Sequence, residues 1–188
     1  MLFWHLGLTA AIVFFTLGHR SIDYRVVLLG AILPDLIDKP IGRIFFEEEF
    51  QNGRIFGHTL LFSTLLLLAI QLSLRGSAAR RWFILPIASL IHVALDGMWN
   101  EPVTLFWPLF TTTFPKFPEE SYWWEALMRP LEHPATLVKE LVGLALLVYI
   151  GAAYRLLEAS RIKEFMRTGV LRQPRAAGPS SSEGAEAQ

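Results

Sequence analysis

The stretch LIHVALDGMW, residues 90–99, closes an apolar run that begins near Trp82 and carries two polar side chains, His92 and Asp96. They are four residues apart, so on a helix both point to one face, one turn apart. An imidazole and a carboxylate in an apolar helix are costly unless they are paired, hydrated or bound to a metal. The spacing therefore predicts two ligands of one metal, or one ligand and the group that orients it.

The composition around this stretch indicates a membrane protein. Of the 188 residues, 53% are hydrophobic, and the mean hydropathy is +0.40. The formal net charge is zero, so nucleic acid is not expected as a partner. The chain has no cysteine, which excludes disulfides, thiolate ligands and a cysteine nucleophile.

The apolar residues fall into five long segments without strand alternation, and the chain has no internal repeat. The segments are residues 2–18, 26–38, 57–74, 82–99 and 137–157. We therefore predict an all-α, multi-pass transmembrane helical bundle of about five apolar helices. The first segment has no basic stretch before it and no small-residue cleavage site after it, which favours a retained helix over a signal peptide. The second is about 13 residues long, short against the ~20 that span a bilayer.

The chain then divides into a membrane-embedded domain, residues 1–158, and a tail, residues 159–188, predicted to be basic and then disordered from about Gln173. Residues 75–81 are interpreted as a short basic turn. The basic residues set the orientation, because cytoplasmic loops are enriched in Lys and Arg. Eleven of the seventeen lie after the first, third and fifth segments (Arg20, Arg25, Arg75, Arg80, Arg81, Arg155, Arg161, Lys163, Arg167, Arg172 and Arg175). This side is predicted to be cytoplasmic, with the N-terminus outside the cell membrane.

On this topology the polar residues within the first four segments share the outer face, although none of them was used to assign it. They are His5, Asp35, Asp38, His58, His92 and Asp96. Three histidines and three aspartates suit a divalent ion, with zinc first and manganese, iron or magnesium also open. Two metals are possible, and a metal pair would point to phosphoester hydrolysis. Each residue also has a structural interpretation: hydrogen-bonded pairs between helices, or an Asp38–Lys39 ion pair.

Arg54 lies shortly before His58 and is interpreted either as a phosphate-binding group or as an ordinary interface arginine.

Four motifs in order make the sequence similar to a known family. They are an early His5, then LPDLID at residues 33–38, RIFGHT at 54–59 and IHVALD at 91–96, followed by WP at 107–108. Over roughly residues 1–110 this resembles the YdjM-like family of inner-membrane metal-dependent hydrolases, whose pattern is GH, LPDxD, HRGxTHS, SHxxxD and WP. The second motif has one extra residue here, and the first histidine of the third has no match.

The resemblance implies a metal site with His5, Asp35, His58, His92 and Asp96 as ligands. It also implies a helical fold distantly similar to that of zinc-dependent phospholipases C. The function expected is hydrolysis of a phosphoester by metal-activated water, with Asp38 as base and Arg54 on the phosphate. The substrate would be a small or lipid-linked molecule, and the bilayer the main partner.

A non-enzymatic membrane protein, whose His/Asp cluster is structural or supports partner binding, is the alternative. An intramembrane peptidase is the weakest interpretation, because the chain has no HExxH, GxSxG or GxGD motif.

Overall fold

The computed structural model describes residues 1–17, 22–117 and 133–173, and these parts form helices with no strand among them. In chain order the elements are α1 Leu2–Leu17, α2 Tyr24–Pro40, the π-helical turn η1 Ile41–Phe45, α3 Glu47–Phe50, α4 Leu60–Ser73, α5 Gly76–Trp82, α6 Ile84–Leu95, the 3₁₀ turn η2 Met98–Asn100, α7 Pro102–Leu105, α9 Pro134–Ala153 and α10 Ala159–Thr168. The predicted all-α class is confirmed.

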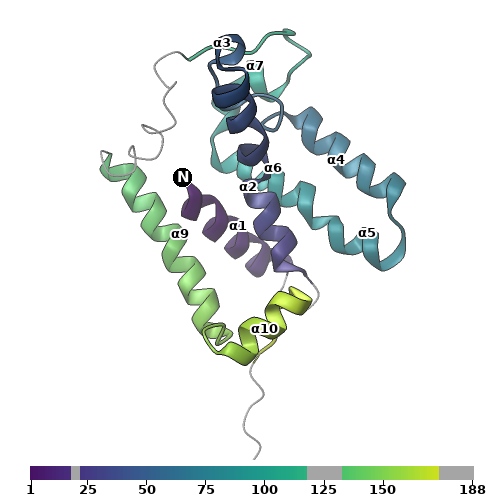
Figure 1. The fold of residues 1–188 in the computed structure, drawn as a ribbon, viewed down its shortest axis with the longest axis vertical. Coiled ribbons are helices and arrows are strands. Elements are labelled where there is room, and N and C mark those ends of the chain that lie inside the picture. Colours follow the sequence, from purple (N-terminus) through teal and green to yellow (C-terminus); the bar gives the residue numbers. More distant parts are fainter. Residues whose placement is uncertain (18–21, 118–132, 174–188) are drawn as a thin grey trace, which may run out of the picture.

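The centre of the bundle is formed by α1, α2 and α6. Helix α1 packs against α9 on one side and α2 on the other, while α2 packs against α6, which also contacts α4. The contact surfaces are small apolar side chains, with Val13, Val27, Ala31 and Ala88 almost without exposure. Figure 1 shows the start of α1, the ends of α2 and α6 and the start of α4 toward the upper part of the bundle, with α10 at the opposite end.

Helix α2 is longer than the predicted 13 residues and spans 17. It begins earlier because the Asp23 side chain caps it, accepting a hydrogen bond from the Arg25 backbone N–H at 3.1 Å. Pro34 lies within the helix without ending it, and the helix continues into η1 at Pro40. Its C-terminal half can therefore carry both Asp35 and Asp38.

The predicted basic turn at residues 75–81 is wrong, because Gly76–Trp82 is helix α5. Ala78, Ala79, Arg80 and Arg81 are strong helix formers, and their propensity outweighs the charge on which the turn was predicted. With α6, this helix makes an almost continuous rod over Gly76–Leu95.

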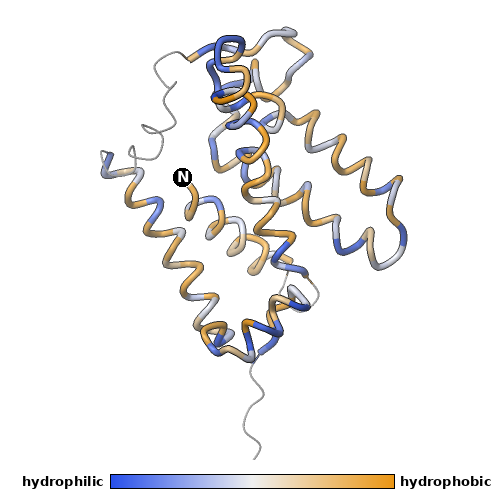
Figure 2. Tube along the Cα trace, viewed as in Figure 1, coloured by the Kyte–Doolittle hydropathy of each residue, from blue (hydrophilic) through white to orange (hydrophobic). Residues whose placement is uncertain are grey.

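Two helices, Gly76–Leu95 and Pro134–Ala153, are long and apolar enough to cross a membrane, at 20 residues each. Twenty helical residues span about 30 Å, the thickness of a bilayer core. Helix α9 exposes much of its apolar surface, including Val138, Leu141 and Val148, and it is hydrophobic along most of its length in Figure 2. Helices α1 and α4 are apolar but shorter, so the number of five spans stays a prediction.

A pair of glycines lets α1 and α9 touch through their backbones. A Cβ atom on Gly7 would lie 2.0 Å from the carbonyl oxygen of Gly143, and one on Gly143 would lie 2.1 Å from that of Phe3. Close helix approach through small residues is common in membrane bundles. On the same face of α9, Glu140 accepts the backbone N–H of Phe3 at 2.8 Å. Together these contacts fix the first turn of α1, which carries His5.

Of the predicted tail, residues 159–188, the structure describes the part up to residue 173. Helix α10 forms, and beyond it Leu171 is buried. The disorder predicted from about Gln173 concerns residues 174–188, which lie outside the described part of the chain. The domain boundary at residue 158 stays a prediction.

Candidate metal centre

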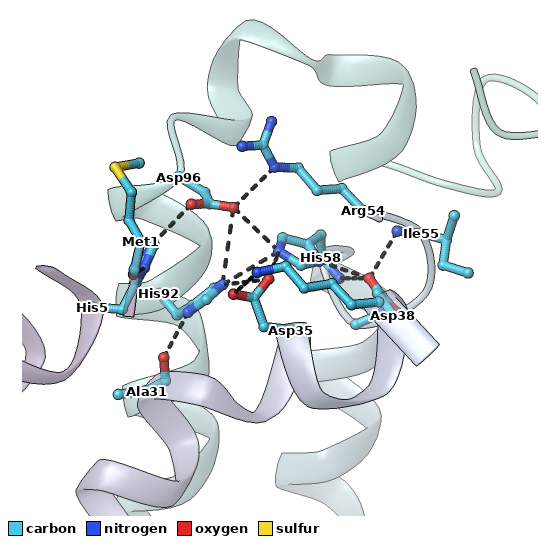
Figure 3. A network of polar contacts seen from close by, with 12 residues as sticks. Met1, His5, Ala31, Asp35, Asp38, Arg54, Ile55, His58, His92 and Asp96 are labelled. Atoms are coloured by element: carbon cyan, nitrogen blue, oxygen red, sulfur yellow. Dashed lines mark hydrogen bonds and ion pairs between the residues drawn. The ribbon is translucent and has the colours of Figure 1, made fainter. Parts of the chain in front are cut away.

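Four side chains, from two helices and the segments that adjoin helices α4 and α6, converge on a single point (Figure 3). Asp35 comes from α2, His58 from the loop before α4, His92 from α6, and Asp96 from the residue after α6. Each offers one nitrogen or oxygen atom, and these four atoms all lie within 4.8 Å of one another. A group of two imidazoles and two carboxylates is a donor set that divalent metals accept.

His92 is held in one orientation by the neighbouring helix. Its ring is fully buried, and Nδ1 lies 2.6 Å from the carbonyl oxygen of Ala31 in α2. A carbonyl can only accept, so Nδ1 carries the proton and donates it. The neutral ring then turns the lone pair of Nε2 toward the centre of the group.

His58 is held in the same way by Asp38. The Asp38 carboxylate accepts Nδ1–H of His58 at 2.7 Å and also the backbone N–H groups of Ile55 at 2.7 Å, Gly57 at 2.7 Å and His58 itself at 3.2 Å. Both oxygens of Asp38 are thus engaged, and its side chain has no exposed surface. A Cβ on Gly57 would lie 2.9 Å from Cα of Pro34, so a glycine is needed where this loop passes α2.

The two ring nitrogens that remain point at each other. Nε2 of His58 and Nε2 of His92 are 3.3 Å apart, and when both rings are neutral, with the proton on Nδ1, each presents a lone pair. Two lone pairs at this distance repel unless a cation, a proton or a metal ion, lies between them. A proton on Nε2 of His58 could be shared with His92 or with Oδ2 of Asp96, also at 3.3 Å, whereas a metal ion would engage all four donors at once.

The carboxylate distances support a metal ion. Oδ2 of Asp96 lies 3.3 Å from Nε2 of His58 and 4.0 Å from Nε2 of His92. Oδ1 of Asp35 lies 3.7 and 3.9 Å from the same two nitrogens. Tetrahedral ligands 2.0–2.1 Å from a zinc ion are about 3.3–3.4 Å from one another. The two imidazole nitrogens already have this spacing, and the wider separations, all within 4.8 Å, would shorten by up to about 1.4 Å around a bound ion, so the residues fit a divalent metal.

His5 and Arg54 flank Asp96. Nε2 of His5 lies 2.8 Å from Oδ1 of Asp96, and its ring stacks on that of His92 with centroids 4.1 Å apart. Nε of Arg54 donates to Oδ2 of Asp96 at 3.0 Å. The arginine side chain is 38% exposed, against 6% for the aspartate. Arg54 thus presents a partly open positive charge directly beside the buried cluster.

Six of the predicted site residues are brought into contact with one another, and Arg54 joins them. Four of the five predicted ligands converge as one group, whereas the fifth, His5, lies on the outer oxygen of Asp96. The alternative interpretation of Asp38, an ion pair with Lys39, is not what the structure shows, because Lys39 pairs with Asp35 at 2.6 Å. Their i, i+4 spacing was a signal for that contact. The Ala31 carbonyl and Glu140 were not singled out, because backbone acceptors and interhelical neighbours leave no local pattern.

The class of protein is now defined: an apolar helical bundle with a buried His/Asp group that can hold a metal ion. The chain belongs to the family described as YdjM inner membrane protein, whose model matches residues 1–163. The match runs through α9 into α10, further than the roughly 110 residues over which the motifs suggested a resemblance. Neither the curated proteins nor the solved structures include a significant match.

Proposed function

We propose that this chain is a membrane-bound, metal-dependent hydrolase of phosphoesters, with zinc as the first candidate metal. The observation that carries the proposal is the convergence of two Nε2 lone pairs and two carboxylate oxygens on one buried point. A divalent ion held there by Asp35, His58, His92 and Asp96 would activate water and polarise a phosphoryl oxygen.

The protein groups around this point have separable roles in the proposal. Arg54, next to the cluster and partly exposed, would bind the anionic phosphate. Asp35 is the aspartate of the cluster most open to solvent, with 21% of its side chain exposed. We propose that it takes the proton of the attacking water as the new P–O bond forms, and returns it to the leaving alcohol as the ester bond breaks.

For Asp38 we propose a role different from that of the base which the sequence suggested. Its Oδ2 accepts three hydrogen bonds from the 55–58 loop and the His58 ring and its Oδ1 accepts one, and because the side chain has no exposed surface, the carboxylate does not face a substrate. We propose that it acts through His58 by fixing the tautomer and orientation of the ring. His5, in contact with Asp96 and stacked on His92, would support the cluster in a similar way.

A lipid-linked substrate is the favoured class. The π-helical turn η1 follows α2 directly after the site-bearing turns, and the chain there exposes Ile44, Phe45 and Phe46 at 63%, 72% and 57%. Exposed aromatic residues of this kind suit the membrane interface. An acyl or prenyl chain could therefore remain in the bilayer while its phosphoester reaches Arg54.

For the orientation we propose the site and the N-terminus outside the cytoplasmic membrane, with the tail in the cytoplasm. The chain has no native cysteine, so single cysteines can report the two sides. Glu49→Cys, near η1, should react with a membrane-impermeant maleimide in intact spheroplasts, whereas Ser160→Cys should react only after lysis. The opposite pattern would reverse the proposed orientation.

The test of function is metal content and phosphodiesterase activity of detergent-purified protein, comparing wild type with His92→Ala. His133→Ala is the matched control, because His133 precedes α9 and lies outside the metal-binding group. Wild type and control should hold metal and cleave a chromogenic phosphodiester, and His92→Ala should lose both while remaining folded. Metal bound without activity on chromogenic or lipid phosphoesters would support a structural site instead, and loss of folding with the metal would do the same.

A further inference from the structure

Helix α10 is amphipathic, and its inner face is fastened to the bundle. The partly buried Phe165 packs against the apolar core. The guanidinium of Arg25 donates to the carbonyl of Met166 at 2.5 Å, and the backbone N–H of Tyr24 donates to the carbonyl of Gly169 at 2.7 Å. In Figure 1, α10 lies at the lower end of the bundle, away from the metal-binding group. Its orientation relative to α2 is therefore fixed.

The outer face of α10 carries an apolar edge beside a basic edge. Ile162 and Met166, one turn apart, are 48% and 62% exposed. Lys163 follows Ile162 and Arg167 follows Met166, and both basic side chains are exposed. Within the described residues neither of these two basic side chains makes an ion pair. Glu164, the acidic residue of this helix, is engaged by Arg161 and Arg172 instead. Two positive charges thus face outward next to exposed aliphatic side chains.

We propose that this face of α10 binds the surface of an anionic phospholipid bilayer, with Ile162 and Met166 among the acyl chains and Lys163 and Arg167 on lipid phosphates. Interfacial helices combine these features, an apolar stripe and a cationic flank. Charge complementarity favours a lipid over a protein partner, because residues 155–172 contain five basic and two acidic side chains.

The position of α10 along the chain agrees with this assignment. Only residues 154–158 separate it from α9, one of the two helices that can cross the membrane. Leu157 in this short connection is 95% exposed and adds to the apolar surface. A helix joined so closely to a membrane span begins at the level of the lipid headgroups. The assignment does not depend on the hydrolase proposal.

The first experiment measures depth with a fluorescent label on a single introduced cysteine, in full-length protein reconstituted singly into lipid nanodiscs. Met166→Cys carries the label on the apolar edge, and Ser160→Cys, exposed at the start of the helix on the side of the basic edge, is the matched control at the level of the headgroups. Acyl-brominated phospholipids should quench the Met166→Cys label several-fold more strongly than the Ser160→Cys label. Equal quenching, or none at either position, overturns the proposal and would favour a protein partner on this face.

The second experiment tests the lipid charge. The Met166→Cys label should be quenched more strongly in nanodiscs of phosphatidylcholine mixed with phosphatidylglycerol than in phosphatidylcholine alone. Adding Lys163→Gln with Arg167→Gln should abolish the difference, whereas Arg75→Gln with Arg80→Gln, an equal loss of charge on the α4–α5 side, should preserve it. Quenching that is the same in both lipid compositions refutes the role of anionic lipid.

Discussion

Replacing Asp38 by asparagine tests whether this residue positions His58 or takes part in the reaction. The change keeps the shape of the side chain but removes its charge and one of its acceptor oxygens. The asparagine keeps most hydrogen bonds when its carbonyl oxygen replaces Oδ2, which in wild type accepts the backbone N–H groups of Ile55 and His58 and the Nδ1–H of His58. The NH₂ group then faces the N–H of Gly57, which now lies 2.7 Å from Oδ1.

The expected cost follows from this accounting. One hydrogen bond to a charged acceptor is lost, worth about 1.5–3 kcal/mol, and three others become bonds to a neutral carbonyl at roughly half their former strength. The free energy of unfolding of Asp38→Asn should therefore fall by about 3–5 kcal/mol, the usual range when a buried charged pair is broken. Because His58 loses its orienting anion, metal affinity should also fall, by about 10- to 100-fold.

The assay combines thermal unfolding in detergent with metal titration against a competing chelator. Asp23→Asn is the matched control, since Asp23 is also buried and holds Arg25 and Arg81, but at the far end of α2. It should lower stability and leave metal affinity unchanged. Our reasoning is refuted if Asp38→Asn binds metal as tightly as wild type. If activity stays absent at saturating metal, Asp38 is a catalytic base after all.

Three further predictions concern separate parts of the molecule. Gly7→Leu should prevent α1 from docking on α9, because even a Cβ at this position meets the Gly143 carbonyl. It should therefore weaken metal binding and lower the unfolding temperature. Gly151→Leu is the control, because no heavy atom lies within 4 Å of a Cβ at that position. Arg54→Gln should raise KM for a phosphodiester about 10- to 100-fold while the metal content stays unchanged, because one charge-assisted contact to the phosphate is lost. An unchanged KM would show that Arg54 does not bind the substrate. Burial acts to raise the pKa of Asp23, but the hydrogen bonds and charges of Arg25 and Arg81 hold this pKa below its ordinary value of 3.8. The stabilisation by the Asp23 carboxylate should therefore be complete above pH 3.8 and be lost as the pH falls below it. Acid titration of the unfolding temperature should show this loss for wild type and not for Asp23→Asn.

The polar groups of the site could be anticipated from the sequence because each stands out from its surroundings. His5, Asp35, His58, His92 and Asp96 stand within or at the ends of apolar segments, and alternating helix directions put them at one end of the bundle. Their convergence was thus predictable, whereas the division between ligands and supporting groups was not. That division depends on angles and distances such as the 3.3 Å between the two Nε2 atoms.

Other features depend on contacts between residues far apart in the chain. Nothing near Asp38 in the sequence indicates that it would accept three N–H groups from residues 55–58, because the loop that supplies them follows a separate helix. Helix α5, in contrast, follows from local propensity, because the alanines and arginines of Gly76–Trp82 favour a helix more than their charge favours a turn. Pro34 also lies inside α2 without ending the helix, although an interior proline removes one backbone hydrogen bond.

The backbone contact between Gly7 and Gly143 has a consequence for how the protein is made. All residues of the metal-binding group and those that flank it lie within the first 96 residues and are synthesised early. The helix against which the His5-bearing turn packs is α9, which begins only at Pro134. Helix α1, the first to be synthesised, therefore packs in its final position only after α9 has entered the membrane, and His5 reaches Asp96 only then. A chain released before α9 is complete would contain all the polar groups of the site and still leave the assembly unfinished.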